Sequence, residues 1–201
     1  MREILIDYPV PRANILPCTS TRSTLLGSSL LALRERGHFD RWSTLVDPRQ
    51  RDAILYTPAG VWLPVAVSEA HYSACERLEL TSEEILVMGN AVARLTQKTV
   101  LAITLRLAQA SGTTPWLTLD QTPRLWGRLY QGSALSLLKL GPKEAELHFV
   151  GNPLSRFAYW RTGLRGIIQA LVQPLATTSY VRERSVPRAD DHPVAYRISW
   201  A

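Results

Sequence analysis

Hydrophobic residues recur at helical spacing along most of residues 22–131. This spacing predicts helices over residues 24–36, 38–46, 47–55, 63–78, 81–110 with a bend between Gln97 and Thr99, and 120–131. Ser20 and Thr21 precede the first helix as candidate caps, because short hydroxyl side chains accept hydrogen bonds from the first free amides of a helix. The first two-thirds of the chain is therefore expected to be mainly helical.

The hydrophobic pattern changes to a period of two after Gly132, which is typical of strands. Strands are predicted over 133–140 and 143–150, joined by a Gly141-Pro142 turn, and again over 177–184 and 194–200. Between the two pairs, residues 156–171 form a helix with a continuous apolar stripe: Phe157, Trp160, Leu164, Ile167, Ile168 and Leu171. The last part of the chain thus reads as a ββαββ unit whose helix covers an antiparallel sheet.

Together these elements predict an α+β fold, with a helical N-terminal part packed on a C-terminal ββαββ antiparallel sheet. Residues 1–21 contain Pro9, Pro11 and Pro17 and are expected to form an extended N-terminal arm. Residues 22–201 are expected to form a single domain, with helices in 22–131 and the ββαββ unit in 133–201.

The composition is that of a globular protein, with 46% hydrophobic and 20% charged residues. The longest apolar run, 100–108, is too short to span a membrane and contains Arg106. The N-terminus lacks the pattern of a secretory signal, and Cys18 and Cys75 offer no disulfide framework. We expect a cytoplasmic protein without a membrane span.

The formal net charge is +6, and residues 151–201 carry 7 basic and 3 acidic side chains, which is +4 of that excess. A local basic excess indicates an anionic ligand or partner, or nucleic acid, or else a solvated basic face without a partner. We expect the solvated face and do not expect nucleic acid as the partner.

Catalytic and metal-binding motifs give little support to an enzyme. His71 and Cys75 are four residues apart on a predicted helix, so they face the same way and suit either a metal or a thiolate–imidazole pair. No third ligand accompanies them, and both residue types also occur buried for packing alone. The chain contains no Gly-x-Ser-x-Gly, phosphate loop or His-Glu-x-x-His. We therefore predict no catalytic and no metal-binding residues.

Aromatic residues and two arginines are better candidates for binding. Aromatic walls with a few polar groups are the usual composition of small-molecule sites. Arg161 and Arg165, four apart on the predicted C-terminal helix, suit a carboxylate or phosphate. The alternative is that the aromatics fill the core or an interface. The candidate ligand-binding residues are His71, Trp126, Tyr130, Tyr159, Trp160, Arg161 and Arg165.

The order of elements, the helix with Arg161-Thr162-Gly163-Leu164-Arg165 and the closing strand Tyr196-Arg197-Ile198-Ser199-Trp200 resemble a myxobacterial family of paralogous proteins of unknown function. More distantly, residues 22–201 resemble the vinyl-reductase-type and haem-nitric-oxide-binding ligand domains, a grouping that includes subunits of vesicle-trafficking complexes. The resemblance implies a small-molecule sensing or scaffolding module, often a homodimer. It implies no reaction.

The haem-binding branch of this grouping has a proximal histidine on a helix and a Tyr-x-Ser-x-Arg triplet for the haem carboxylates. That triplet does not occur in the chain, and His71 lies on the apolar face of its predicted helix. Haem is therefore not expected, and the cofactor is unknown. We expect a non-catalytic sensory or regulatory module that binds an apolar or anionic small molecule. The alternatives are a homodimer-forming interaction scaffold and nucleic-acid binding through the C-terminal arginines.

Overall fold

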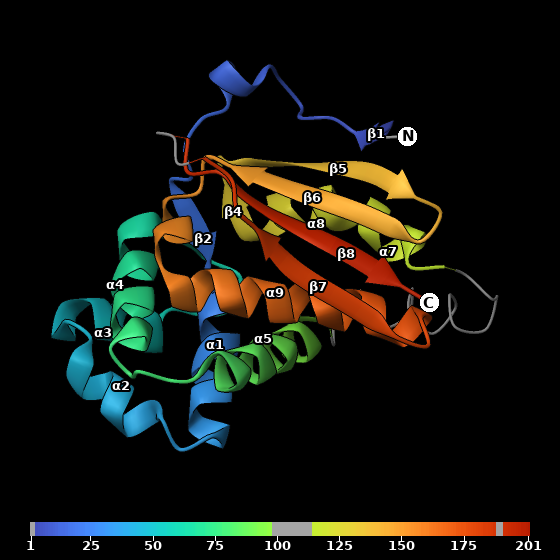
Figure 1. Cartoon of the computed structure of the whole chain (residues 1–201). Helices are drawn as coiled ribbons and strands as arrows, with labels where there is room; N and C mark the ends of the chain where they lie inside the picture. The colour runs from blue at the N-terminus through green and yellow to red at the C-terminus, as the bar shows by residue number, and fades with distance from the viewer. Residues whose placement is uncertain (1–2, 98–113, 188–190) are drawn as a thin grey trace.

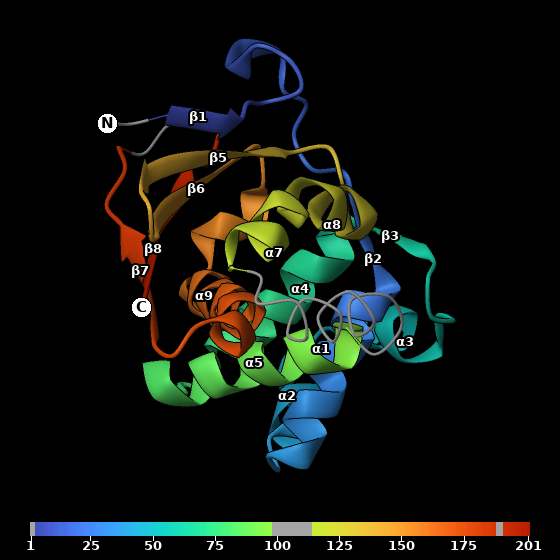
Figure 2. The ribbon, with the colours of Figure 1, turned by 90° about the vertical axis from the view of Figure 1, so that its right-hand side faces the viewer.

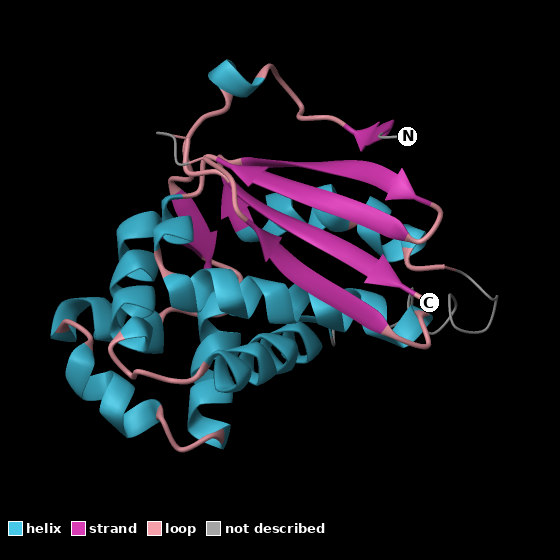
Figure 3. Ribbon diagram, viewed as in Figure 1, coloured by secondary structure: helices cyan, strands magenta, loops and turns pink. Residues whose placement is uncertain are grey.

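The computed structural model describes residues 3–97, 114–187 and 191–201. It has the predicted α+β fold, with a curved antiparallel sheet on one side of the molecule and helices on the other (Figure 1). Figure 3 separates the two layers by colour and shows the N-terminal helices grouped away from the large sheet. The fold class read from the hydrophobic pattern is confirmed.

Five strands in the order β1-β5-β6-β8-β7 make up the large sheet, and every neighbouring pair is antiparallel. The strands are β1 (Glu3–Ile6), β5 (Ala134–Gly141), β6 (Glu144–Val150), β7 (Ser179–Arg184) and β8 (Val194–Trp200). Leu147 on β6 lies opposite Leu137 on one side and Tyr196 on the other, and all three side chains are buried. The predicted hairpin is confirmed.

The N-terminal segment is more closely attached than an extended arm. β1 adds a fifth strand at the edge of the sheet beside β5, where Glu3 lies opposite Lys139. Further along, the backbone amide of Cys18 donates to the carbonyl of Gly151 at 2.7 Å. The amide of Ser133 donates to the carbonyl of Leu16, also at 2.7 Å. Residues 16–18 are thus hydrogen-bonded to the start of β5 and to the end of β6.

A second, smaller sheet has the order β3-β2-β4, with β2 (Ser20–Arg22), β3 (Trp62–Pro64) and β4 (Tyr130–Gln131). The expectation that Ser20 and Thr21 cap the first helix is wrong, because both residues belong to β2 and their backbones pair with β3 and β4. The backbones of Ser20 and Thr21 are used for strand pairing and are therefore not placed to cap the helix.

The helical N-terminal part begins with α1 (Ser23–Glu35), α2 (Phe39–Leu45), α3 (Pro48–Tyr56) and α4 (Val65–Glu76). Asp47 caps the start of α3, and Pro48 is the first residue of the helix, as expected for this pair of residue types. Asp47 Oδ1 accepts hydrogen bonds from the amides of Arg49 and Gln50. The start of α4 falls two residues later than predicted because Leu63 and Pro64 belong to β3.

α5 (Ser82–Gln97) opens with a capping box. The Glu84 carboxylate accepts from the amide of Thr81 at 2.7 Å, and the Thr81 hydroxyl accepts from the amide of Glu84 at 3.3 Å. The predicted bend near Gln97 and the predicted continuation to residue 110 lie outside the described residues.

The helix predicted over 120–131 is divided into α7 (Trp116–Asp120) and α8 (Thr122–Leu129), and its last two residues form β4. Pro123 stands in the first turn of α8. A proline has no amide hydrogen to continue an earlier helix, but it suits the first turn of a new one. The division sets α8 over the inner face of the large sheet (Figure 2).

α9 (Ala158–Val172) follows a 3₁₀ turn, η2 (Pro153–Arg156), and the other 3₁₀ turns are η1 (Arg12–Asn14) and η3 (Gln173–Leu175). Four residues of its predicted apolar stripe, Trp160, Leu164, Ile168 and Leu171, are buried. Ile167 and Phe157, the residue before the helix, are half-buried. α9 lies side by side with α5 (Figures 1 and 2). A methyl group on Gly166 would lie 2.4 Å from the carbonyl oxygen of Leu86, so the two backbones are in close contact.

Helices α7, α8 and α9 lie on the same, inner face of the large sheet (Figure 2). The core between them contains Leu137, Leu147, Tyr196 and Ile198, each with none of its surface exposed. None of the helices in the described ranges has the length and apolarity needed to cross a membrane.

Candidate functional site

An aromatic cluster forms where α8 approaches the sheet and α9. The Trp126 ring lies 4.3 Å from that of Tyr130, 4.7 Å from that of Phe149 and 6.2 Å from that of Trp160, measured between centroids. These residues come from α8, β4, β6 and α9, so the cluster joins four elements. Tilted and edge-on contacts at such distances are favourable arrangements for aromatic rings.

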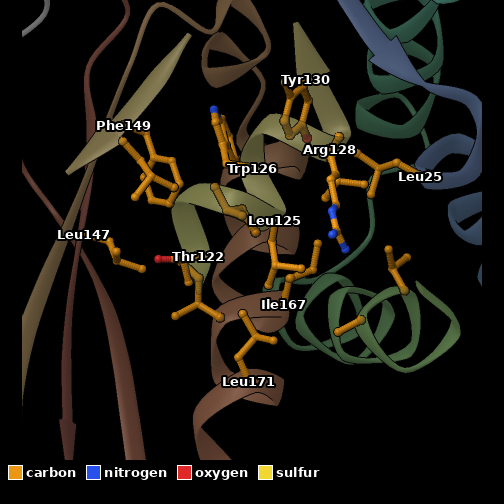
Figure 4. A pocket seen from close by; sticks show the side chains of 16 residues that line it. Leu25, Thr122, Leu125, Trp126, Arg128, Tyr130, Leu147, Phe149, Ile167 and Leu171 are labelled. Atoms are coloured by element: carbon orange, nitrogen blue, oxygen red, sulfur yellow. The ribbon is translucent and has the colours of Figure 1, made fainter. Parts of the chain in front are cut away.

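Beside this cluster is a pocket of about 170 Å³ between α8, α9, the end of α5 and the inner face of the sheet (Figure 4). Apolar side chains make up most of the wall. The residues that line it are Leu25, Val92, Ala93, Thr122, Leu125, Trp126, Arg128, Leu129, Tyr130, Leu135, Leu147, Phe149, Leu164, Ile167, Ile168 and Leu171.

Most polar groups of the pocket wall already have partners. The Thr122 hydroxyl donates to the carbonyl of Leu119 at 2.6 Å, and Trp126 Nε1 donates to Ser133 Oγ at 2.9 Å. The Tyr130 hydroxyl accepts from Trp160 Nε1 at 3.3 Å. Burial raises the pKa of Tyr130, so this phenol stays protonated. The pocket is suited to an apolar molecule and not to one that needs many hydrogen bonds.

The structure brings part of the predicted binding set together. Trp126 and Tyr130 line the pocket, whereas Tyr159 and Trp160 line a neighbouring cavity of about 30 Å³ together with Tyr130. The Tyr159 hydroxyl donates to the sulfur of Met88 at 3.5 Å. Tyr130 and Trp160 therefore connect the two cavities, but the smaller one has room for little more than a water molecule.

His71 lies in the core and lines neither cavity. Its Nε2 is 3.0 Å from Ser29 Oγ and 3.5 Å from Cys75 Sγ, and its side chain has no exposed surface. Burial lowers the pKa of His71 to about 3 and raises that of Cys75. The pair is therefore a neutral imidazole beside a neutral thiol, and a buried protonated thiol is unreactive.

Arg161 and Arg165 also lie outside the pocket wall. The Arg161 guanidinium donates to Glu183 Oε1 at 2.9 Å and to the carbonyl of Ser155 at 2.7 Å. Its own carbonyl accepts from the Tyr196 hydroxyl at 2.8 Å. Arg161 thus ties α9 to β7, to η2 and to β8, and its charge is used within the fold.

Other arginines of the C-terminal segment are paired in the same way. The nitrogen–oxygen distances are 3.1 Å for Arg156–Glu69, 2.9 Å for Arg161–Glu183, 3.8 Å for Arg184–Glu146 and 2.6 Å for Arg197–Glu144. Two of these acids belong to β6 and one to α4, outside residues 151–201. The basic excess of the segment is therefore largely balanced by acids from elsewhere in the chain.

Two features of the pocket were not anticipated from the sequence: the contribution of the sheet through Phe149, and Arg128. Thr122, Leu125 and Leu129 are spaced three and four apart, and this spacing signals one helix face. Arg128, three residues after Leu125, belongs to the same side of the helix. A helical wheel of α8 alone contains this signal.

The tryptophans do not form an exposed interaction face. Trp42, Trp126, Trp160 and Trp200 are buried. Trp62 and Trp116 are half-buried, and the Arg22 guanidinium covers the Trp62 ring at 3.8 Å from its centroid. A homodimer-forming scaffold would therefore need a surface other than the tryptophans.

The residues present do not fit haem in this pocket. Haem iron takes histidine, cysteine, methionine or tyrosine as its protein ligand. Tyr130 is the one such residue in the described wall, and its hydroxyl is already bonded to Trp160. Residues 98–113, outside the described ranges, contain none of the four types. The volume of about 170 Å³ is also well below the roughly 300 Å³ at which pockets for larger ligands begin.

In the part of the chain that the structure describes, no group of three or more His, Cys, Asp or Glu side chains is placed to hold a metal ion. No protein-family model and no curated protein matches the chain.

Solved structures do match. An Fe(II) unliganded H-NOX protein from K. algicida aligns over 90% of this chain and 96% of its own, with a TM-score of 0.64 and 8% identity. An oxygen-binding H-NOX domain related to soluble guanylate cyclases aligns over 89% and 94%, with a TM-score of 0.58 and 13% identity. These likenesses concern the fold and leave the myxobacterial and vinyl-reductase-type resemblances as expectations. The chain has the fold of the H-NOX domains, the haem-nitric-oxide-binding branch of the predicted grouping.

Proposed function

We propose that the chain is a non-catalytic small-molecule-binding module of a sensory or regulatory kind, and that its ligand occupies the pocket between α8, α9 and the sheet. The observation that carries the proposal is the pocket of about 170 Å³ with an aromatic wall at Trp126, Tyr130 and Phe149. Apolar cavities with a few placed polar groups are the usual form of a small-molecule site.

The fold supports a ligand-binding role by analogy. One solved H-NOX domain of this fold is an oxygen complex. In the present chain the ligand has to be recognised differently, because the pocket wall is apolar and offers no iron ligand other than the bonded Tyr130. The proposed ligand is therefore an organic molecule with an apolar body.

The pocket volume limits the size of that body. An engineered apolar cavity of about 150 Å³ takes up benzene. The pocket here, at about 170 Å³, is slightly larger. We therefore assign a ligand body of about six carbons, either a ring or a short chain.

The test is the binding of two neutral probes, toluene and 1-hexanol, to the whole chain by ligand-observed NMR. We expect both to bind, and we expect Leu125→Trp to weaken both at least tenfold because the indole fills the pocket. Leu31→Trp is the matched control, since Leu31 is on α1, outside the pocket wall and 41% exposed. Probes that bind the wild type and Leu125→Trp equally, or bind neither, would contradict the proposal.

Two parts of the expected function, the cytoplasmic location and the homodimer, stay predictions beside this proposal.

A further inference from the structure

Arg128 is the one charged side chain among the described residues that line the pocket. It belongs to the last turn of α8 and is exposed, so its guanidinium is in contact with solvent. Figure 4 shows the side chain projecting from α8 among the apolar side chains of the wall. A cation at the open side of an apolar pocket is placed to bind the charged end of a ligand whose body lies inside.

The guanidinium of Arg128 has no partner within the described chain. The hydrogen bond found at this residue uses its carbonyl, which accepts from Arg22 Nε at 3.2 Å. Arg22 is itself a second cation here, and it donates to the carbonyl of Gly60 at 2.7 Å. Among the residues with a described position, no carboxylate forms an ion pair with either arginine. This contrasts with Arg156, Arg161, Arg184 and Arg197, each of which has a carboxylate partner within the fold.

We propose that the ligand is an apolar monocarboxylate, with its body of about six carbons in the pocket and its carboxylate on Arg128. The inference rests on the proposed function and names the chemical class of its ligand. One guanidinium offers two parallel N–H donors, which match the two oxygens of one carboxylate. The other polar groups of the wall, on Thr122, Trp126 and Tyr130, are already bonded, so recognition of the anion falls to Arg128.

Hexanoate and 1-hexanol separate the charge from the apolar body, because they share a six-carbon chain and differ in the head group. Calorimetric titration at neutral pH and low salt is expected to give at least tenfold tighter binding of hexanoate to the wild type. Arg128→Gln should reduce the affinity for hexanoate at least tenfold, to that of hexanol. Arg124→Gln should change neither, since Arg124 is on the same helix, bonds to Gln121 Oε1 at 3.4 Å and lies outside the pocket wall.

Two further measurements guard against an indirect effect of the substitution. Arg128→Lys keeps the charge and loses the paired donors, so its affinity for hexanoate is expected between those of the wild type and Arg128→Gln. Raising the salt concentration should weaken hexanoate binding to the wild type and leave hexanol binding unchanged. Circular dichroism checks that each variant is folded.

The outcomes distinguish this inference from the function on which it rests. Equal affinities of hexanoate and hexanol for the wild type, or an unchanged hexanoate affinity in Arg128→Gln, would overturn the carboxylate assignment and leave the apolar pocket standing. Loss of hexanoate binding in Arg124→Gln as strong as in Arg128→Gln would also overturn it, since a general surface attraction would then explain the affinity. Failure of both probes to bind would remove the proposed function itself.

Discussion

His71 illustrates how the core holds a titratable residue in one form. Its imidazole has no exposed surface, is bonded to Ser29 Oγ at 3.0 Å and lies 5.6 Å from the ring of Trp42. Its Nδ1 has no partner in the described part of the chain. A proton added to this ring would be a buried charge without a counter-ion, which explains why its pKa falls to about 3.

We predict that His71 makes the stability of the protein fall in mild acid. The unfolded chain binds the proton near the ordinary pKa of 6.5, whereas the native state resists it down to about 3. Stability from the neutral imidazole is therefore complete above pH 6.5 and is lost as the pH falls. The loss is about 1.4 kcal/mol for each pH unit between those two values. Urea denaturation at pH 7.0, 6.0 and 5.0 measures it.

The His71→Gln variant should lack this part of the pH dependence, although it starts from a lower stability at pH 7. His38→Gln is the control. It also removes one histidine, but His38 is half-buried at the start of α2, whereas His71 has no exposed surface. Parallel curves for the wild type and His71→Gln between pH 7 and pH 5 would show that the imidazole is not held neutral.

Single residues also show where prediction from the sequence ends. The apolar surroundings of His71 followed from its helix face, but its distance from the pocket depends on how α4 packs. Arg161 was a reasonable anion ligand until β7 placed Glu183 beside it. Arg128 shares a helix face with Leu125, but that face points to a binding site only once the pocket is known. Charge partners distant in the sequence decide which arginines are available.

At the level of elements, the contact between α5 and α9 depends on glycine. A methyl group on Gly89 would lie 2.1 Å from the carbonyl oxygen of Gly163, and one on Gly166 would lie 2.4 Å from that of Leu86. Both distances are far inside van der Waals contact and involve backbone atoms, which cannot turn aside. Gly163 differs from them, because a methyl group there meets only Ile85 Cγ2 at 4.0 Å.

We predict opposite effects of alanine at two positions one turn apart in α9. Gly166→Ala forces the helices apart and should lower the free energy of unfolding by about 2 kcal/mol or more. Gly163→Ala meets no obstacle and should raise it by up to about 1 kcal/mol, since alanine favours the helix over glycine. The shift of the urea midpoint, followed by circular dichroism, gives both values. Equal effects of the two substitutions would exclude close packing as the role of Gly166.

Element order was largely predictable, because each helix and strand has its own hydrophobic period and turn residues. The errors fall where a short segment pairs with a distant one. Ser20 and Thr21 read as a helix cap but pair with β3 and β4, and Tyr130 and Gln131 read as the end of a helix but form β4. A strand of two or three residues is too short to show an alternating hydrophobic pattern in the sequence. The small sheet is therefore visible only once its three strands are placed together.

At the level of the whole molecule, the N-terminal segment joins the two sheets. The amide of Thr19 donates to the carbonyl of Gln131 at 2.8 Å, and the carbonyl of Thr19 accepts from Val65 at 2.8 Å. Gly132, beside this segment, has a φ of +78°, and a methyl group on it would lie 2.2 Å from the carbonyl oxygen of Pro17. The segment thus holds β4 and the start of β5 at a fixed separation.

We predict that Gly132→Ala destabilises the protein more than the same change at Gly60. Gly60 has a φ of +84° with open space around it, so alanine there meets only the backbone strain of about 1 kcal/mol. At Gly132 the clash with Pro17 adds roughly 1–3 kcal/mol. The midpoint of thermal unfolding compares the two variants. Similar midpoints would mean that the N-terminal segment does not hold the sheets together.

The glycine contact between α5 and α9 also restricts how the molecule can respond to a guest. With carbonyl groups pressed against Gly89 and Gly166, neither helix can slide along the other without collision. α5 and α9 are therefore fixed relative to each other along their axes and act as one rigid wall of the pocket. A guest too large for the pocket then has to displace another part of the wall, such as α8, which Gln121 and Tyr130 flank. Because the backbone of Tyr130 pairs with Thr21 and its hydroxyl accepts from Trp160 of α9, that displacement reaches both the small sheet and α9 through one residue.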